Sequence, residues 1–534
     1  MSGSWRFALA LLACAAPARL AIVTLGGPVR RAVGGRLTQL GVAAVVWCGG
    51  AGMLAASQRG PMAMSLPDAL LLIMATMGAL LLIHVARMPL AARRLTPPRD
   101  AQGAATRLAP GSLSFADGVA ALGDRAFYLR AFARHGPVFS MSQFGSPTLC
   151  VLGLDRRQAI MRTHGASLGP APLPFSRSVL RGFLRYMDDA THNHYGPLVR
   201  RAMIADTPAH VQRQLQDVLH RHLHAAAQVA ARHPGHGAAA AALIEPMVRE
   251  ALDLLLFGFE AANAGEHGSD DHPAERFRRD AHAFYHIRTS KRLGVVEEQM
   301  LAQLVAQLDA QETRLMASKR DQDFPLGRLR TLDDAQPDDT SLQNLVFMHR
   351  IATNNVSGLI SWLLVHWAQH PDIVTRIRSA STGEQHLLLQ RFLAETLRVA
   401  QSEYTYRAVA RTFVHDGIVY PEGWLVRFCV WESHRDPTAF DDPTSFRLRL
   451  EPDAYTKSRF APFGTGRHAC NGADLNELLC VSLLFALTRH FDVTAAQVEP
   501  LQRAGRHWGH WQPNTRAHFR LQARPDGHNV DAAS

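Results

Sequence analysis

The sequence predicts a mainly α-helical fold with small β-hairpins, preceded by transmembrane helices at the N-terminus. Three observations lead to this prediction. Apolar residues recur at helical spacing over long segments, short strand-like segments gather around residues 409–428, and apolar stretches occupy the N-terminal end. The chain has 534 residues, of which 47% are hydrophobic, so it is long enough to bury a large core.

The N-terminal segment, residues 1–95, is predicted to be a membrane anchor with one to three transmembrane helices. Its best candidate span is Ala69–Ala86, which carries no charge and reaches about 27 Å at ~1.5 Å per residue, enough for a thin bilayer. Leu40–Ala56 is shorter and rich in glycine, and Phe7–Leu25 is interrupted by a proline and an arginine. A single span at Ala69–Ala86 and three spans both remain open.

Positive charges predict the orientation of this anchor. Arginines lie between the first and second stretches and again directly after the third, whereas the intervening loop carries only Arg59 and Asp68. Because positive residues favour the cytoplasmic side of a membrane, the remaining residues, 96–534, are expected to face the cytosol. The segment Leu95–Arg99 contains two prolines, which predict a stiff hinge between the two parts.

Cysteine usage and net charge narrow the class of protein. The six cysteines are scattered, and two of them fall in the proposed spans, so the chain lacks a disulfide framework and fits a reducing compartment. The net charge is +11, yet the sequence contains no nucleic-acid-binding motif. Contact with anionic lipid head groups and an acidic protein partner therefore explains the positive net charge better than nucleic-acid binding does.

Residues 96–534 contain the predicted helices, strands and loops of the fold. Two polar segments, Ala262–Glu275 and Leu326–Thr340, are expected to be loops. Short strands are expected around Val409–Phe428, where a glycine- and proline-containing turn separates apolar runs, and near the C-terminus. The segments with helical spacing are Gln343–Arg378, with a break near His370-Pro371, His386–Ala400 and Leu475–His490.

One cysteine, Cys470, follows a glycine-containing turn and precedes the predicted helix Leu475–His490. Glycine permits backbone conformations that allow a turn to wrap closely around a sulfur atom. A thiolate near a helix N-terminus is further stabilised by the helix dipole and by unpaired amides. A lowered thiol pKa favours metal ligation, so this segment is predicted to hold a deprotonated cysteine toward a metal.

The spacing around Cys470 resembles the haem-ligand loop of the cytochrome P-450 superfamily. In that family the cysteine is the axial thiolate ligand of haem iron. The resemblance implies the cytochrome P-450 fold for residues 96–534, haem b as cofactor and Cys470 as the metal ligand. Asn471 departs from the family pattern, because the residue after the cysteine is usually apolar. The matching positions before and after the cysteine are Phe463, Gly466, His468 and Gly472.

A second motif lies about 75 residues earlier in the chain. Glu395 and Arg398 are three residues apart in a helical run, so they can pair on one face, and they resemble the family's Glu-x-x-Arg helix behind the haem. Arg407 falls where the family places a haem-propionate arginine. The family's third structural arginine would fall at Leu450, and Arg449 is one residue early. Either Arg449 takes this role through a shifted backbone, or the Glu-Arg-Arg triad is incomplete.

The oxygen-activation motif of the family falls at Ile351–Asn355 when counted back from His370. Most oxygenases of the family carry an acid followed by threonine at the last two positions, which deliver protons. Here these positions are Asn354 and Asn355, which form hydrogen bonds but do not titrate. Either the asparagines orient a water chain with help from Thr353, or oxygen activation is lost. A slipped register, with Thr353 as the usual threonine, is the third possibility.

The resemblance implies a membrane-bound, microsomal haem-thiolate monooxygenase that inserts one oxygen atom from O₂ into a lipophilic small molecule. A secondary metabolite, terpenoid or steroid is the expected substrate class. The implied partners are a flavin-containing NADPH reductase and membrane lipids, and the implied location is the endoplasmic reticulum membrane. The alternative is a reductase-independent isomerase or dehydratase that acts on a peroxide or endoperoxide, which the two asparagines suggest.

Two further groups of residues carry weaker signals. His220 and His224 share a helix face, but no third ligand is evident nearby, so a zinc site is not favoured. Arg200-Arg201 falls where the family often has a second propionate contact, and two surface arginines are the simpler interpretation.

Overall fold

The computed structural model describes residues 97–525, with gaps in that range. The chain divides into two compact units, one containing the residues up to Pro174 and Tyr404–Cys429, the other Phe175–Glu403 and Val430–Ser534. Each unit is described by itself. The predicted anchor lies outside the described residues, and no helix within the described part is long and apolar enough to cross a bilayer. The gaps are residues 101–102, 144–145, 172–182, 185–186, 188, 205, 234–236, 261–271, 287–293, 333–338, 401–403, 467–468, 504–509 and 515.

A six-stranded sheet forms the centre of the first unit, with the strand order β1-β2-β3-β9-β6-β4. The pairs β2–β3 and β6–β9 are antiparallel, whereas β3 and β9 run parallel. The strands are β1 Gly111–Ser112, β2 Val138–Gln143, β3 Ser146–Val151, β4 Leu168–Pro170, β6 Tyr404–Val409 and β9 Leu425–Cys429. The unit also contains α5 Phe115–Gly123, α6 Phe127–His135 and α7 Leu154–His164.

A tight hairpin also belongs to this unit, formed by β7 (Phe413–His415) and β8 (Ile418–Tyr420). Its two turn residues, Asp416 and Gly417, have φ of 51° and 70°. Positive φ at both positions is the signature of a two-residue type I′ turn, which an Asp-Gly pair favours. The strands predicted around Val409–Phe428 are therefore confirmed. The larger sheet was not expected, because β3 and β9 lie far apart in sequence.

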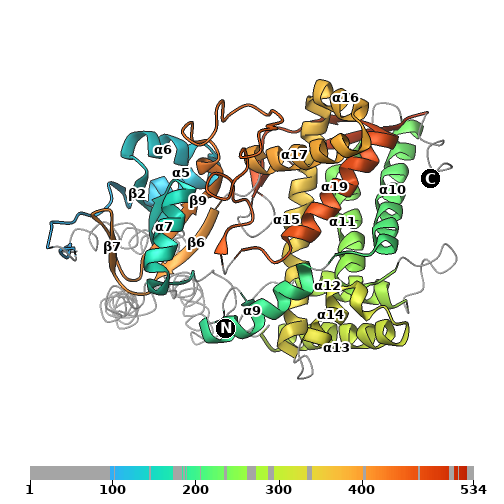
Figure 1. Ribbon diagram of the computed structural model, residues 1–534, viewed down its shortest axis with the longest axis horizontal. Helices are drawn as coiled ribbons and strands as arrows, with labels where there is room; N and C mark the ends of the chain where they lie inside the picture. Colours follow the sequence, from blue (N-terminus) through green and yellow to red (C-terminus); the bar gives the residue numbers. More distant parts are fainter. Residues whose placement is uncertain are drawn as a thin grey trace, which may run out of the picture. The chain divides into compact units, whose positions relative to one another are not determined.

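The second unit is helical, and Figure 1 shows α15 running beside α11, with α10 and α19 on the same side of the unit. A three-stranded sheet, ordered β10-β13-β5, and the pair β11–β12 complete it. Its helices are α9 Asp189–Ile204, α10 Ala209–Arg232, α11 Ala240–Phe257, α12 Pro273–His286, α13 Gly294–Ala317, α14 Pro325–Leu332, α15 Asp339–Gln369, α16 Pro371–Ser379, α17 Thr382–Ala400, α18 Val430–Ser433 and α19 Ala473–His490. Its strands are β5 Ala238–Ala239, β10 Phe491–Ala496, β11 Gln502–Arg503, β12 Trp511–Gln512 and β13 His518–Ala523.

The three helices predicted from apolar spacing are confirmed. Helix α15 ends at Gln369 and α16 begins at Pro371, so the long predicted helix breaks at His370-Pro371. A proline removes a helical N–H and disfavours a helical residue before it, which explains the break. The helices α17 and α19 match the other two predicted segments.

One predicted loop is wrong. The segment Leu326–Thr340 was expected to be a loop, yet most of α14 lies in its first half. Leu326 and Leu329, three residues apart, are buried in the helical core. Burial of this short apolar face outweighs the polar residues between them. The other predicted loop, Ala262–Glu275, lies mostly outside the described residues, and α12 begins at its end.

Candidate functional site

Cys470 sits at the end of a turn whose backbone is closely fixed. Its N–H donates to the carbonyl of Phe463 at 2.8 Å, and the Ala469 N–H donates to Gly466 at 3.0 Å. Gly464 and Gly466 have φ of 74° and 72°, a region that favours glycine. The turn leads into α19, and the Cys470 side chain is exposed. His468, the predicted basic position of this loop, lies outside the described residues.

The pKa of the Cys470 thiol is raised, whereas the sequence predicted a lowered value. Desolvation is the dominant cause, although part of the side chain is exposed. The Gly472 backbone N–H and the Arg200 charge oppose it, as the proposed helix-start effect requires, but they do not outweigh it.

Arg200, on α9, reaches the same turn. Its guanidinium lies 3.3 Å from the Ala469 carbonyl and 3.5 Å from the Gly466 carbonyl, and its Nε lies 3.4 Å from Asn471 Oδ1. Arg200 was only a weak candidate from the sequence, yet it joins α9 to the cysteine loop. Asn471, which departs from the expected pattern, thus has a partner on this arginine.

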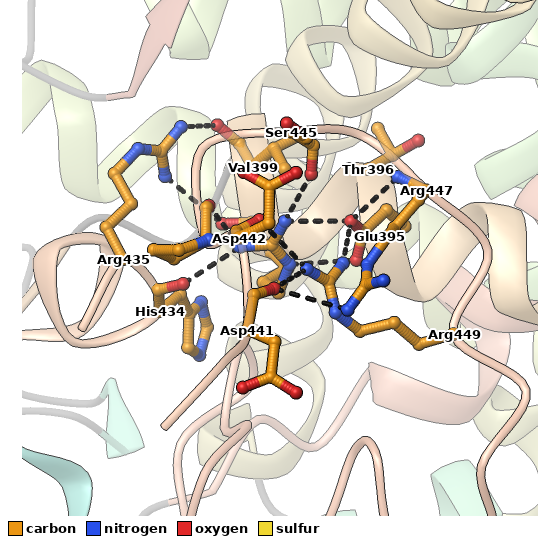
Figure 2. A network of polar contacts seen from close by, with 12 residues as sticks. Glu395, Thr396, Val399, His434, Arg435, Asp441, Asp442, Ser445, Arg447 and Arg449 are labelled. Atoms are coloured by element: carbon orange, nitrogen blue, oxygen red, sulfur yellow. Dashed lines mark hydrogen bonds and ion pairs between the residues drawn. The ribbon is translucent and has the colours of Figure 1, made fainter. Parts of the chain in front are cut away.

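A buried charge cluster lies in the second unit, centred on Glu395 of α17 (Figure 2). Glu395 and Arg398 are fully buried and form a bidentate pair at 2.7 and 2.8 Å. A guanidinium and a carboxylate in this geometry make two parallel charge-assisted hydrogen bonds. The remaining Arg398 donors bind backbone carbonyls, at His434, Pro443 and Ser445, between 2.6 and 2.9 Å.

Arg449 completes this cluster. Its Nη1 donates to Glu395 Oε1, and its Nη2 donates to the carbonyls of Asp441 and Asp442 at 2.8 and 3.1 Å. Leu450, where the family's third arginine was expected, is 37% exposed. Of the two possibilities left open by the sequence, the structure therefore contains the one with Arg449 in a shifted register.

Two further groups bind Glu395 that sequence reasoning missed. The Tyr455 hydroxyl donates to Oε2 at 2.9 Å, and the Arg447 backbone N–H donates to Oε1 at 3.1 Å. Both lie in irregular backbone, where no periodic pattern marks their direction. The carboxylate is thus satisfied on both oxygens, as a buried charge requires.

His434 lies beside this cluster and is fully buried. Burial, with the Arg398 and Arg435 charges nearby, lowers its pKa to about 3. The neutral ring accepts a hydrogen bond from the Ala461 N–H at 3.3 Å. His434 therefore supports the segment before the cysteine loop only while it is uncharged.

The residues of the predicted oxygen-activation motif differ in their surroundings. Thr353 is buried, and its hydroxyl donates to the His349 carbonyl at 2.8 Å. Asn354 is exposed, and its side chain makes no hydrogen bond to the residues that the structure describes. Asn355 is half-buried. Ile351, one turn before Asn355, is 39% exposed, so this side of α15 is open.

The opposite side of α15 is fixed by a polar cluster. His349 Nε2 lies 3.0 Å from Asp253 Oδ1, and His349 Nδ1 lies 2.6 Å from the Tyr285 hydroxyl. Arg278 donates to the other Asp253 oxygen at 2.6 Å. These contacts join α11, α12 and α15, so the first half of α15 is firmly positioned.

Arg407 lies in the first unit, on β6, and not in the unit that contains Cys470. It is half-buried, and its Nη1 donates to the Tyr406 carbonyl at 3.1 Å. The predicted site residues that the structure places in one unit are Phe463, Gly466, Cys470, Glu395, Arg398, Thr353, Asn354 and Asn355.

Comparison with known proteins gives consistent similarities. Residues 297–518, which include the Glu395 cluster and the Cys470 loop, match the family model described as Cytochrome P450. This match and the curated relatives support the cytochrome P450 superfamily. In sequence the chain resembles abscisic acid 8'-hydroxylase 2 of Arabidopsis thaliana, with 29% identity over 169 residues. It also resembles the mitochondrial 25-hydroxyvitamin D-1 alpha hydroxylase of Homo sapiens, with 30% identity over 190 residues.

These matches are partial. They cover 28% and 31% of this chain and 34% and 37% of the two relatives, so the chain spans about a third of the length of the curated relatives it matches. The solved structure described as retinoic acid bound cyanobacterial CYP120A1 has a TM-score of 0.62 and 17% identity, and covers 79% of this chain and 100% of that one. This likeness shows that the chain has the fold of that protein.

The donor chemistry of the described residues fits haem. Among them, no group of three or more histidine, cysteine or acidic side chains could hold a bare metal ion. A single exposed thiol can hold a metal only if most ligands come from elsewhere, and a porphyrin supplies four. Cys470, presented by a fixed glycine turn, would therefore be the residue that holds haem iron.

Proposed function

We propose that this protein is a haem-thiolate monooxygenase that inserts one oxygen atom from O₂ into a lipophilic small molecule. One observation carries the proposal: the exposed thiol of Cys470 lies at the end of a fixed turn that leads into α19. The curated relatives support it, because their names describe hydroxylation of lipophilic molecules, namely abscisic acid and a vitamin D.

Each part of the protein has a role in this proposal. Cys470 would hold the haem iron, and bound haem supplies the oxygen chemistry. Arg200 holds the carbonyls of Gly466 and Ala469 in the loop before the thiolate. The Glu395 cluster holds the earlier segment between His434 and Arg447, and Arg407 is the proposed propionate contact. Asn354 would order water on the open side of α15, because its amide can both donate and accept hydrogen bonds.

Isotope labelling tests this activity. The haem-loaded protein, NADPH and a flavin-containing reductase are incubated with lipophilic candidates under ¹⁸O₂. We expect one labelled oxygen atom in the product and no product when NADPH is omitted. Product that forms equally well without NADPH and reductase would contradict the proposal.

A second function is favoured by the α15 motif. Asn354 and Asn355 do not titrate, and the Thr353 hydroxyl is held by the His349 carbonyl. A site without a proton donor of this kind suits an isomerase or dehydratase that rearranges a peroxide and needs neither O₂ nor a reductase. Turnover of a fatty-acid hydroperoxide without NADPH would identify this function.

We also propose that residues 96–534 form the catalytic part and residues 1–95 its anchor in the endoplasmic reticulum membrane, with the catalytic part facing the cytosol. The net charge of +11 supports contact with anionic lipids and an acidic reductase surface. Carbonate extraction of a chain that lacks residues 1–95 tests the anchor. If this shortened chain still sediments with membranes, the N-terminal segment is not the sole anchor.

A further inference from the structure

Arg350 on α15 is a half-buried cation without an ion-pair partner among the residues that the structure describes. Its guanidinium carbon lies 5.5 Å from the ring centre of Phe284 and 5.9 Å from that of Tyr285, both on α12. Its one hydrogen bond to a described residue, to the Tyr285 carbonyl, is long at 3.4 Å. Most of its donor groups therefore have no acceptor in the part of the chain that the structure describes.

Such a group is unusual because taking a charge out of water is unfavourable unless the charge is paired. Desolvation by burial lowers the pKa of Arg350, which is the physical sign of this cost. Glu297 on α13 is the acid whose charge acts on Arg350, but the two form no ion pair. Glu297 is itself only 3% exposed, and burial raises its pKa, which favours its neutral form.

Arg350 lies near the open side of α15, the side that carries the exposed residues Ile351 and Asn354. At about 100° per residue, Asn354 lies one helical turn after Arg350 and about 40° from it around the helix axis, between the directions of Arg350 and Ile351. Apolar rings line the start of this side. Phe347 packs against Phe284 with ring centres 6.5 Å apart, and against Phe183 at 5.3 Å.

We propose that Arg350 binds the carboxylate of an acidic lipophilic substrate, so that the apolar body of the molecule lies along the open side of α15. This inference rests on the proposed monooxygenase function and defines its substrate class. A guanidinium presents a planar pair of donors that matches a carboxylate in a bidentate manner. The aromatic rings beside it exclude water and strengthen this contact, and an apolar surface adjoins it.

A purely structural role is the competing explanation, because Arg350 also contacts the last turn of α12, where a cation stabilises the free carbonyls. The two roles respond differently to substitution. A structural arginine would change the stability of the fold without changing the choice between an acid and its alcohol. A carboxylate-binding arginine would change that choice and leave alcohol binding intact.

Spin-state titrations of the haem-loaded, full-length protein test the inference. The probes are two matched pairs, dodecanoic acid with dodecan-1-ol and abietic acid with abietinol. In the unaltered protein we expect at least one acid to bind about tenfold more tightly than its alcohol, as a charge-assisted hydrogen bond provides. In Arg350→Gln this preference should disappear, while the Kd of the alcohol stays within about twofold. Arg350→Lys should retain part of the preference.

Arg279→Gln is the matched control, because it removes the same charge from an arginine that is 52% exposed and lies on α12, the helix that Arg350 contacts. It should leave the preference unchanged. The inference is overturned if no acid is preferred to its alcohol in the unaltered protein, or if the preference survives Arg350→Gln. The carbon monoxide difference spectrum of each sample distinguishes failure of this inference from failure of the proposed monooxygenase function. A thiolate-type band without an acid preference rejects this inference alone, whereas absence of the band in unaltered protein rejects the proposed function as well.

Discussion

Arg449 donates a hydrogen bond to Glu395, a residue 54 positions earlier in the chain, and with Arg398 it encloses this buried carboxylate between two guanidinium groups. The same two arginines bind backbone carbonyls in the segment between His434 and Ser445. The carboxylate therefore holds irregular backbone that leads toward the Cys470 loop, and a single buried charge organises a long connection without regular structure.

Substitution of Arg449 by Met should destabilise the protein by about 3–5 kcal/mol, because removing one partner of a buried ion pair leaves the remaining charge poorly compensated. Urea unfolding of the haem-loaded protein measures this change. Leu450→Ala is the control, since Leu450 is exposed, and it should change the free energy of unfolding by less than about 1 kcal/mol. Equal effects of the two substitutions would show that Arg449 is not the third member of the cluster.

His434 should make the fold sensitive to mild acid. Its pKa is about 3 in the folded protein, against an ordinary value of 6.5, so below pH 6.5 the unfolded chain binds a proton that the folded protein does not. The contribution of neutral His434 is complete above pH 6.5 and falls by about 1.4 kcal/mol per pH unit below it, or about 2 kcal/mol at pH 5. His434→Gln should reduce the loss of stability between pH 7.5 and 5.

The measurement is the free energy of unfolding in urea at both pH values. His224→Gln serves as the control, because His224 is exposed, and it should follow the unaltered protein. If His434→Gln shows the same pH dependence as the unaltered protein, His434 does not hold its low pKa in the folded state.

Arg200→Gln should increase the rate at which haem dissociates from the protein. Arg200 contacts two carbonyls of the cysteine loop and Asn471, at distances of 3.3 to 3.5 Å that indicate modest bonds. Loss of about 1 kcal/mol in the loop corresponds to about fivefold faster haem transfer to apomyoglobin. Arg201→Gln removes the neighbouring, exposed arginine and should transfer haem at the unaltered rate. Identical rates for both variants would assign Arg200 no part in the loop.

Substitutions of Asn354 and Thr353 should differ in their effect on coupling, which is the amount of product formed per NADPH consumed. Asn354→Leu should lower the product formed per NADPH consumed by about tenfold or more, because it removes the hydrogen-bonding group on the open side of α15. Thr353→Val should change coupling by less than about twofold, since its hydroxyl is buried on the His349 carbonyl. The reverse order of effects would show that Thr353 occupies the usual threonine position and that the register is slipped.

Local patterns in the sequence were sufficient to predict the parts of the fold that depend on interactions between residues close in the chain. Apolar spacing placed α15, α17 and α19, and a proline marked the break before α16, because burial of one face and a missing N–H act within a few residues. The glycines before Cys470 marked its loop, because the backbone conformation of a tight turn also depends on a few neighbouring residues. The pairing of β3 with β9 depends on segments more than 250 residues apart, and no local pattern specifies it.

The site was less predictable where tertiary contacts determine the role of a residue. Arg449 could not be assigned from the sequence, because its segment is irregular and no helix or strand period fixes which residue faces Glu395. The pKa of Cys470 was expected to be low from the adjacent helix, yet desolvation, which only the folded structure reveals, raises it. Arg350 carried no motif, and its lack of an acidic partner among the described residues is a property of the fold.

The carbon monoxide difference spectrum of reduced, haem-loaded protein shows whether Cys470 is the thiolate ligand of haem iron. We expect the absorbance band of thiolate-ligated haem in the unaltered protein and in Cys480→Ala, and its loss in Cys470→Ala. A thiolate band that survives Cys470→Ala, or iron bound without any sulfur in the unaltered protein, would contradict this assignment.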